Sequence, residues 1–222
     1  ALIRRIEARL RDTGLRILDV EAVWLTPDTE VDRLLPVLET GQRLGASHLL
    51  TVGNDPDEAR ATENFARLCE AAESFGIKPT LELIPYCQTG TLEAALRLVA
   101  RAGHANAGIL IDALHLIRSG GTPEALRAID PALLDYCQIC QAGSGRPLGT
   151  DLLRAEARGN RLYPNSPEGR LPLAEILAAL PPDLVLGVEA PCSGHAGLSP
   201  VERGRLCGQS TRAFLDSISS RH

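Results

Sequence analysis

The sequence predicts an α/β fold and, among such folds, a closed (β/α)8 TIM barrel. Short apolar runs typical of buried strands alternate with amphipathic helical segments, which indicates a parallel sheet covered by helices. None of these runs is followed by the glycine-rich turn of open dinucleotide-binding sheets. Polar side chains suited to chemistry follow at least four strands, which favours a barrel because its strand-to-helix loops open at one mouth.

The spacing of apolar residues sets each element in turn. In the first helix Leu2, Ile6 and Leu10 recur at helical spacing, and Gly14 is a suitable helix stop. No clear periodicity is visible in residues 143–171, which are predicted to be irregular. Strands are expected at residues 16–25, 47–53, 80–85, 107–113, 134–142 and 185–191. Helices are expected at residues 1–13, 30–44, from the 54–57 turn to 75, 91–102, 122–129, 172–180 and 199–218.

Length and composition set the outer limits. The 222 residues suit a single domain, 1–222. The predicted strands are too few for a closed barrel and the chain begins within a predicted helix, so we expect an N-terminally incomplete domain that lacks its first β-α-β segment. The net charge is −5 and no basic stretch is present, so no nucleic-acid partner is expected. No secretory signal and no apolar run of about 20 residues is present, so we expect no membrane partner and a cytoplasmic location.

The stretch from Gly108 to Gly121 carries the strongest chemical signal. It places Asp112 and then His115 at the exit of an apolar strand, and two other predicted strands deliver Glu82 and Glu189. Because barrel strands end at one mouth, we expect these three carboxylates to meet. Carboxylates packed together raise one another's pKa unless a cation lies between them, so their meeting predicts a divalent metal ion. Each acid alone would more often be solvated or cap a helix.

The cysteines and the single lysine give weaker signals. Cys137 and Cys140 have CxxC spacing without the second pair of a zinc site, and residues three apart in a strand point to opposite faces. We therefore expect reduced, buried thiols. Lys78 lies at the entrance of a predicted strand, so a Schiff-base mechanism is not expected.

A set of residues in this chain resembles the metal site of the xylose isomerase-like TIM-barrel superfamily, which includes the sugar phosphate isomerase/epimerase family: Glu82, the Asp112-x-x-His115 pair, Gln138 and Glu189. Residues 169–177 also resemble the glycine-proline-leucine helix start of that family. The resemblance implies four metal ligands: Glu82, Asp112, Gln138 and Glu189. It implies that Glu82 and Glu189 are catalytic. His115 is a third candidate catalytic residue and a candidate substrate contact, because an ordinary histidine pKa of about 6.5 suits a base or a hydrogen-bond donor. Further candidate substrate contacts lie in the long segment after the Gln138 strand, where a cation could hold a carboxylate or phosphate: Arg146, Arg158 and Arg161.

The same resemblance implies one divalent metal ion as the cofactor. Oxygen ligands favour Mn²⁺ or Mg²⁺, with Zn²⁺ and Co²⁺ as alternatives. The chain departs from the usual pattern in three places. Gln138 stands where many members have histidine, Gln141 replaces a common aspartate, and Pro167 stands in a usual Gly-Glu-Gly run.

The implied function is metal-dependent isomerisation or epimerisation of a small sugar, keto-sugar or sugar phosphate. Glu82 and Glu189 would act as the acid/base pair across an enediolate. Two alternatives remain open: a metal-dependent dehydratase (a lyase) of a cyclic keto acid such as 3-dehydroshikimate or an inosose, and a noncatalytic metal- or ligand-binding barrel. The expected partner is a small-molecule carbohydrate or keto acid. Barrels of this family often dimerise, so a homodimer is one expected assembly.

Overall fold

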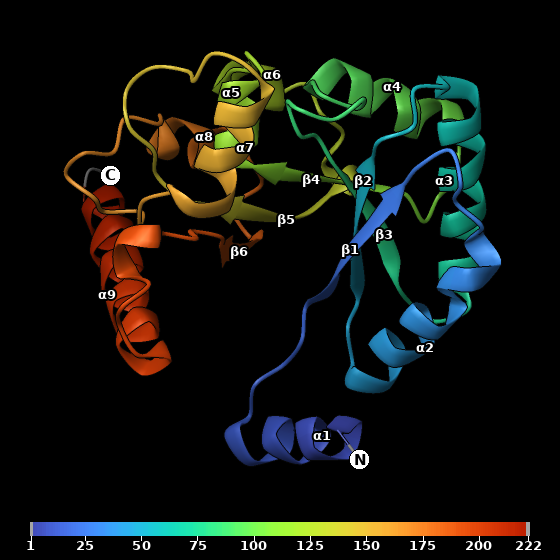
Figure 1. Ribbon diagram of the computed structural model, residues 1–222, viewed down its shortest axis with the longest axis horizontal. Helices are drawn as coiled ribbons and strands as arrows, with labels where there is room; N and C mark the ends of the chain where they lie inside the picture. The colour runs from blue at the N-terminus through green and yellow to red at the C-terminus, as the bar shows by residue number, and fades with distance from the viewer. Residues whose placement is uncertain (1, 221–222) are drawn as a thin grey trace. The chain divides into compact units, whose positions relative to one another are not determined.

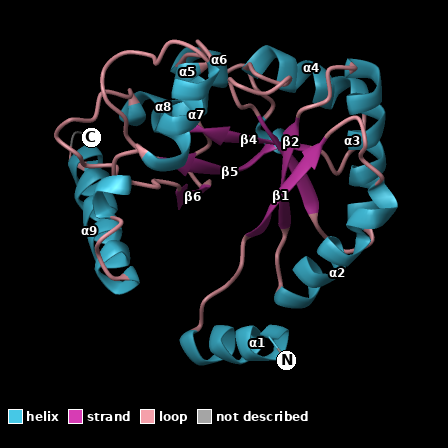
Figure 2. Cartoon of the chain, viewed as in Figure 1, coloured by secondary structure: helices cyan, strands magenta, loops and turns pink. Residues whose placement is uncertain are grey.

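The computed structural model describes residues 2–220, and its helices and strands alternate along the chain (Figures 1 and 2). The order of the strands in the sheet is their order in the sequence, β1-β2-β3-β4-β5-β6. Sequential parallel neighbours joined by helices are the arrangement that the sequence predicts. The chain divides into two compact units. Unit 1 extends to Glu82 and includes Cys87–Thr89 and Glu93–Ile109, and unit 2 comprises Leu83–Tyr86, Gly90–Leu92 and the chain from Leu110 onward.

Unit 1 pairs its first three strands in parallel, β1 with β2 and β2 with β3. Helices α2 and α3 lie along one side of these strands (Figure 1). Asp57 begins α3 because its side chain accepts hydrogen bonds from the free backbone N–H groups of Ala59 and Arg60. Gly45 ends α2 with a φ of 81°, a conformation that other residues rarely adopt. The strands are β1 (Asp19–Leu25), β2 (His48–Gly53) and β3 (Lys78–Glu82), and the helices are α1 (Leu2–Thr13), η1 (Val31–Leu34), α2 (Leu35–Leu44), α3 (Glu58–Glu73) and α4 (Leu92–Ala102).

Unit 2 contains most of β4 and the parallel pair of β5 and β6. Every residue of β4 is buried, which explains its unbroken apolar run. The strands are β4 (Gly108–Asp112), β5 (Leu134–Ile139) and β6 (Val185–Val188). The helices are α5 (Ala113–Arg118), α6 (Pro123–Leu126), η2 (Pro131–Leu133), α7 (Thr150–Gly159), α8 (Leu173–Ala179), η3 (Ser193–His195) and α9 (Pro200–Ser219).

Two helices lie where the sequence predicts none. The segment 143–171 is not irregular throughout, because α7 occupies Thr150–Gly159. A helix also begins directly after β4, where no element is predicted: Asp112 caps α5, which carries His115. Helix α5 has only six residues, and α7 has only two large apolar residues, Leu152 and Leu153, so neither shows a clear helical periodicity in the sequence. Between residues 2 and 220, no helix has both the length and the apolar character needed to cross a membrane.

Candidate metal centre

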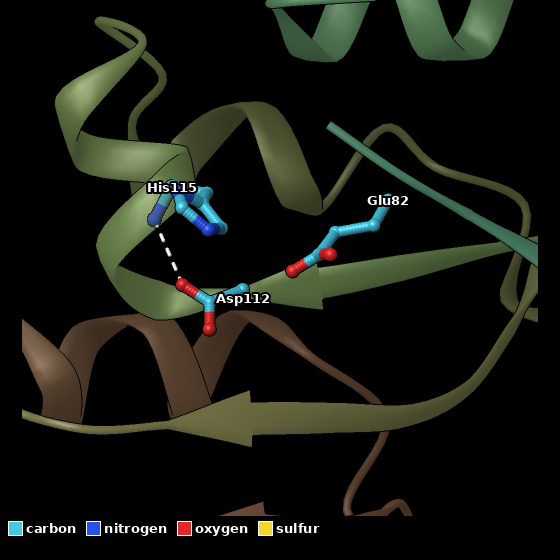
Figure 3. Close-up of side chains that lie close together, drawn as sticks. All are labelled: Glu82, Asp112 and His115. Carbon is cyan, nitrogen blue, oxygen red and sulfur yellow. Dashed lines mark hydrogen bonds between the residues drawn. The ribbon is translucent and has the colours of Figure 1, made fainter. Parts of the chain in front are cut away.

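Asp112 is the best-defined residue of the site. It is the last residue of β4, is fully buried, and also caps α5. Its Oδ1 accepts a hydrogen bond of 2.8 Å from the backbone N–H of His115, which is drawn in Figure 3. This cap fixes the orientation of the carboxylate at the point where the strand ends. The other oxygen, Oδ2, therefore points to a different partner.

That partner is Arg161, an arginine that is only 1% exposed. Its Nη1 lies 2.5 Å from Asp112 Oδ2, and its Nη2 lies 3.2 Å from Glu189 Oε2. The remaining donors also have acceptors, because Nε donates to the Ala157 carbonyl at 2.9 Å and Nη1 to the Glu189 carbonyl at 3.2 Å. One guanidinium thus connects the acid at the end of β4 with the acid that follows β6.

His115 completes this cluster in unit 2. It is 3% exposed, and its ring meets the Tyr86 ring edge-on with centroids 5.9 Å apart. Its Nε2 lies 3.3 Å from Arg161 Nη2. A guanidinium can only donate, so Nε2 is the acceptor and the proton of the neutral imidazole lies on Nδ1. Burial lowers the pKa of His115 to about 4, and the ring is therefore neutral at neutral pH.

Charge pairing controls the ionisation of the two central groups. Burial raises the pKa of Asp112, but the charge of Arg161, the neighbouring His115 and the hydrogen bonds to both residues together hold that pKa below its ordinary value. Burial lowers the pKa of Arg161, but its neighbours, Asp112 first among them and then Cys140 and Glu189, together raise that pKa above its ordinary value, so the guanidinium stays protonated. Both groups are therefore charged in an apolar setting.

The remaining predicted ligands also lie at strand ends. Glu82 is the last residue of β3 and is 4% exposed, and Gln138 lies on β5 beside Gly187 of β6 and is 5% exposed. Glu189 follows β6, and its side chain is 38% exposed. Within unit 2, Asp112 offers a carboxylate oxygen and His115 an imidazole nitrogen as potential ligand atoms, and Glu82 offers a carboxylate oxygen at the end of β3 in unit 1. Carboxylate oxygens with an imidazole nitrogen form a donor set that suits a divalent ion.

The three arginines predicted as substrate contacts lie in different environments. Arg161 belongs to the cluster, whereas Arg146 and Arg158 are exposed, the latter in the last turn of α7. The role of Arg161 as a partner of two acids was missed, because no local pattern distinguishes it from its neighbours. Arg118 is also buried, but it pairs with Glu156 of α7 through two contacts of 2.8 Å.

Gln141, which replaces a common family aspartate, connects two backbone segments. Its amide donates to the Leu171 carbonyl at 3.0 Å and accepts from the Leu171 N–H at 2.8 Å. An ionised aspartate could not donate the first of these bonds. The amide also explains Gly169, because a Cβ there would lie 2.6 Å from Gln141 Cδ.

The cysteines agree with the sequence-based expectation. All six are free, and Cys137 and Cys140 are buried. Burial raises the pKa of the Cys140 thiol to about 12, so it remains protonated. Its Sγ lies 3.7 Å from Arg161 Nη1, which makes it a neighbour of the cluster.

These features define an α/β domain with a candidate divalent-metal group at the ends of its strands. Residues 1–203 match the family model described as a xylose isomerase-like TIM barrel. The chain therefore belongs to the xylose isomerase-like TIM-barrel family, which confirms the resemblance and the fold class predicted from the sequence. No match was found among curated protein sequences.

Solved structures share the fold. The IOLI protein with a bound zinc atom has a TM-score of 0.84 and 18% identity, over 97% of this chain and 82% of that chain. The probable 3-DHS dehydratase AsbF from Bacillus anthracis has a TM-score of 0.68 and 16% identity, over 88% and 76%. A D-allulose 3-epimerase from Methylomonas sp. in complex with D-allulose has a TM-score of 0.65 and 19% identity, over 92% and 73%. At these identities the likeness concerns the fold alone.

Proposed function

We propose that this protein is a divalent-metal-dependent isomerase or epimerase of a small sugar, keto-sugar or sugar phosphate. One observation carries the proposal: acids from two different strand ends, Asp112 and Glu189, converge within reach of a single guanidinium and beside the neutral His115. Such convergence is typical of an active site at the carboxyl ends of parallel strands. The family and the sugar epimerase among its structural neighbours support the same reaction class.

The proposed ligands are Glu82, Asp112, Gln138 and Glu189, with His115, whose backbone N–H donates to Asp112, as a further donor. A bound divalent ion would act as a Lewis acid on a substrate carbonyl or hydroxyl. The mixed oxygen and nitrogen donors suit Mn²⁺, and Mg²⁺, Zn²⁺ and Co²⁺ are the ions to compare with it.

The chain's own residues supply the proton transfer. Glu82 and Glu189 are proposed to remove and return the proton at the carbon next to the substrate carbonyl, across an enediolate. Glu189 suits this exchange because its side chain is partly exposed, so a substrate can reach it. His115, neutral at neutral pH, would hydrogen-bond to a substrate oxygen. Arg146 and Arg158 are exposed and are proposed as contacts for an anionic substrate group.

Deuterium exchange tests this proposal directly. The protein is stripped with a chelator, reloaded with Mn²⁺, and incubated in D₂O with D-fructose, D-tagatose or D-allulose. We expect deuterium at the carbon next to the carbonyl by NMR, and we expect no exchange without metal. The variant Glu189→Gln should lose exchange by at least about 100-fold because it removes one base. A metal-loaded protein that exchanges no proton in any of these sugars would contradict the proposal.

A dehydratase is the second candidate, and the structural neighbour AsbF is the observation that favours it. Loss of water from 3-dehydroshikimate would give an aromatic product that absorbs in the ultraviolet. If the Mn²⁺-loaded protein produces this absorbance and exchanges no sugar proton, the lyase replaces the epimerase as the proposed function. If it binds metal and shows neither reaction, the noncatalytic barrel is the remaining alternative.

A further inference from the structure

Arg161 is a permanent cation buried among the acids of the candidate metal centre. Its side chain is 2% exposed and reaches Asp112 and Glu189 at 2.5 and 3.2 Å. It also donates to His115 Nε2 at 3.3 Å. Three donor groups that a divalent ion would use therefore already have a positive partner within the chain.

The fold holds this guanidinium firmly in place. Its Nε is bound to the carbonyl of Ala157 in α7, two residues before that helix ends. The guanidinium contacts Cys140 and Ala157, which belong to an apolar cluster of buried residues that also includes Leu114, Ala142 and Leu171. In such surroundings a carboxylate without a cation is costly, so the arginine stabilises Asp112 in the absence of any metal.

The same contacts oppose metal binding. A cation beside the donor atoms repels a second cation, and His115 Nε2 cannot give its lone pair to both Arg161 and an ion. The negative charges of Asp112 and Glu189 can therefore be compensated by the Arg161 guanidinium or by a divalent ion, but not by both through the same contacts.

We propose that Arg161 is the built-in counter-cation of the metal centre, which holds Asp112, Glu189 and His115 in the metal-free protein and competes with a divalent ion for them. This inference rests on the proposed function, since it assumes that these residues bind a metal. It predicts that the metal-free protein is folded and that metal affinity is limited by the arginine. A divalent ion displaces the guanidinium from at least one of these partners when it binds.

The test compares Arg161→Gln with Arg118→Gln. Arg118 is the matched control because it is a buried arginine in the same unit that pairs with Glu156 instead of the site acids. For each chelator-stripped protein, calorimetry gives the Mn²⁺ affinity, and thermal unfolding with and without Mn²⁺ gives the stability. We expect R161Q to bind Mn²⁺ more tightly than the wild type, by about 5- to 150-fold, the usual range for coupled sites. Its unfolding temperature should fall without metal and recover with saturating Mn²⁺.

The control should behave differently. R118Q should also have a lower unfolding temperature than the wild type, but its Mn²⁺ affinity should equal that of the wild type. Saturating Mn²⁺ should therefore raise the unfolding temperatures of R118Q and of the wild type by the same amount. If R161Q binds Mn²⁺ with unchanged or lower affinity while the wild type binds it, Arg161 organises the ligands and the inference is wrong. If neither the wild type nor R161Q binds any divalent ion, the metal-dependent function itself fails.

A measurement on the wild type keeps the proposal testable if R161Q does not fold. In protein with ¹⁵N-labelled arginine, buried guanidinium groups give protected N–H signals, and R118Q identifies the signal of Arg118. Titration with diamagnetic Zn²⁺ should shift the Arg161 signal and leave that of Arg118 in place. An Arg161 signal that stays unchanged at saturating Zn²⁺ would overturn the inference.

Discussion

Two buried aspartates near strand ends make a useful comparison, Asp55 after β2 and Asp112 at the end of β4. Both side chains are fully buried, and both pair with an arginine. Asp55 binds Arg60, whose side chain is 43% exposed, through two contacts of 2.7 Å. Asp112 binds Arg161, which is almost completely buried and also reaches Glu189.

The difference shows how a structural ion pair differs from one suited to a functional site. Arg60 is five residues from Asp55, serves that carboxylate with a bidentate contact, and remains partly in water. Arg161 comes from 49 residues away and divides its donors among several acceptors. Because one desolvated cation is shared between Asp112 and Glu189, a divalent ion that binds these acids would have to compete with it.

The largest expected effect comes from neutralising the two aspartates in turn. Asp112→Asn keeps the shape of the side chain but leaves Arg161 without its closest carboxylate in an apolar setting. We expect the metal-free protein to lose about 3–5 kcal/mol of unfolding free energy, the usual cost of breaking a buried pair. Asp55→Asn should cost clearly less, because Arg60 can turn to water. Urea unfolding of both variants measures this, and equal losses would remove the distinction between the two sites.

The same contrast explains what the sequence could predict. Three acids can be recognised in the sequence because each lies at the end of an apolar run, where parallel α/β folds place their functional side chains: Glu82, Asp112 and Glu189. Arg161 is not recognisable, because its position depends on how the chain returns after α7 and not on any local spacing. Helices α5 and α7 were missed because α5 is only six residues long and α7 has only two large apolar residues among charged ones, which is too little periodicity to detect. The metal-ligand roles of Glu82, Asp112, Gln138 and Glu189 all stay predictions.

The stability contributed by the Asp55–Arg60 pair should depend more strongly on salt concentration than that contributed by the Asp112–Arg161 pair. Arg60→Gln removes a partly exposed cation, so we expect a small decrease in the urea midpoint at low ionic strength. That decrease should largely disappear near about 1 M NaCl, because dissolved ions screen exposed charges over about 3 Å. Arg161 is desolvated, and the decrease caused by Arg161→Gln should persist at the same salt concentration. Equal salt sensitivity of the two variants would show that Arg161 is more accessible to water than its contacts indicate.

The smallest expected effect is the acid dependence of the Asp55 pair. Hydrogen bonds from Arg60 hold the pKa of Asp55 below its ordinary value despite burial. A carboxylate whose pKa is lowered in the folded state contributes stability that is fully present above the unfolded value of about 3.9. That contribution is lost as the pH falls through the folded pKa, because the folded protein must then bind the proton as well. The difference in unfolding temperature between wild type and Asp55→Asn should therefore be constant at about pH 5–7 and shrink below about pH 4. A difference that stays constant into acid would mean that Asp55 acts through its hydrogen bond to Asp57 rather than through its charge.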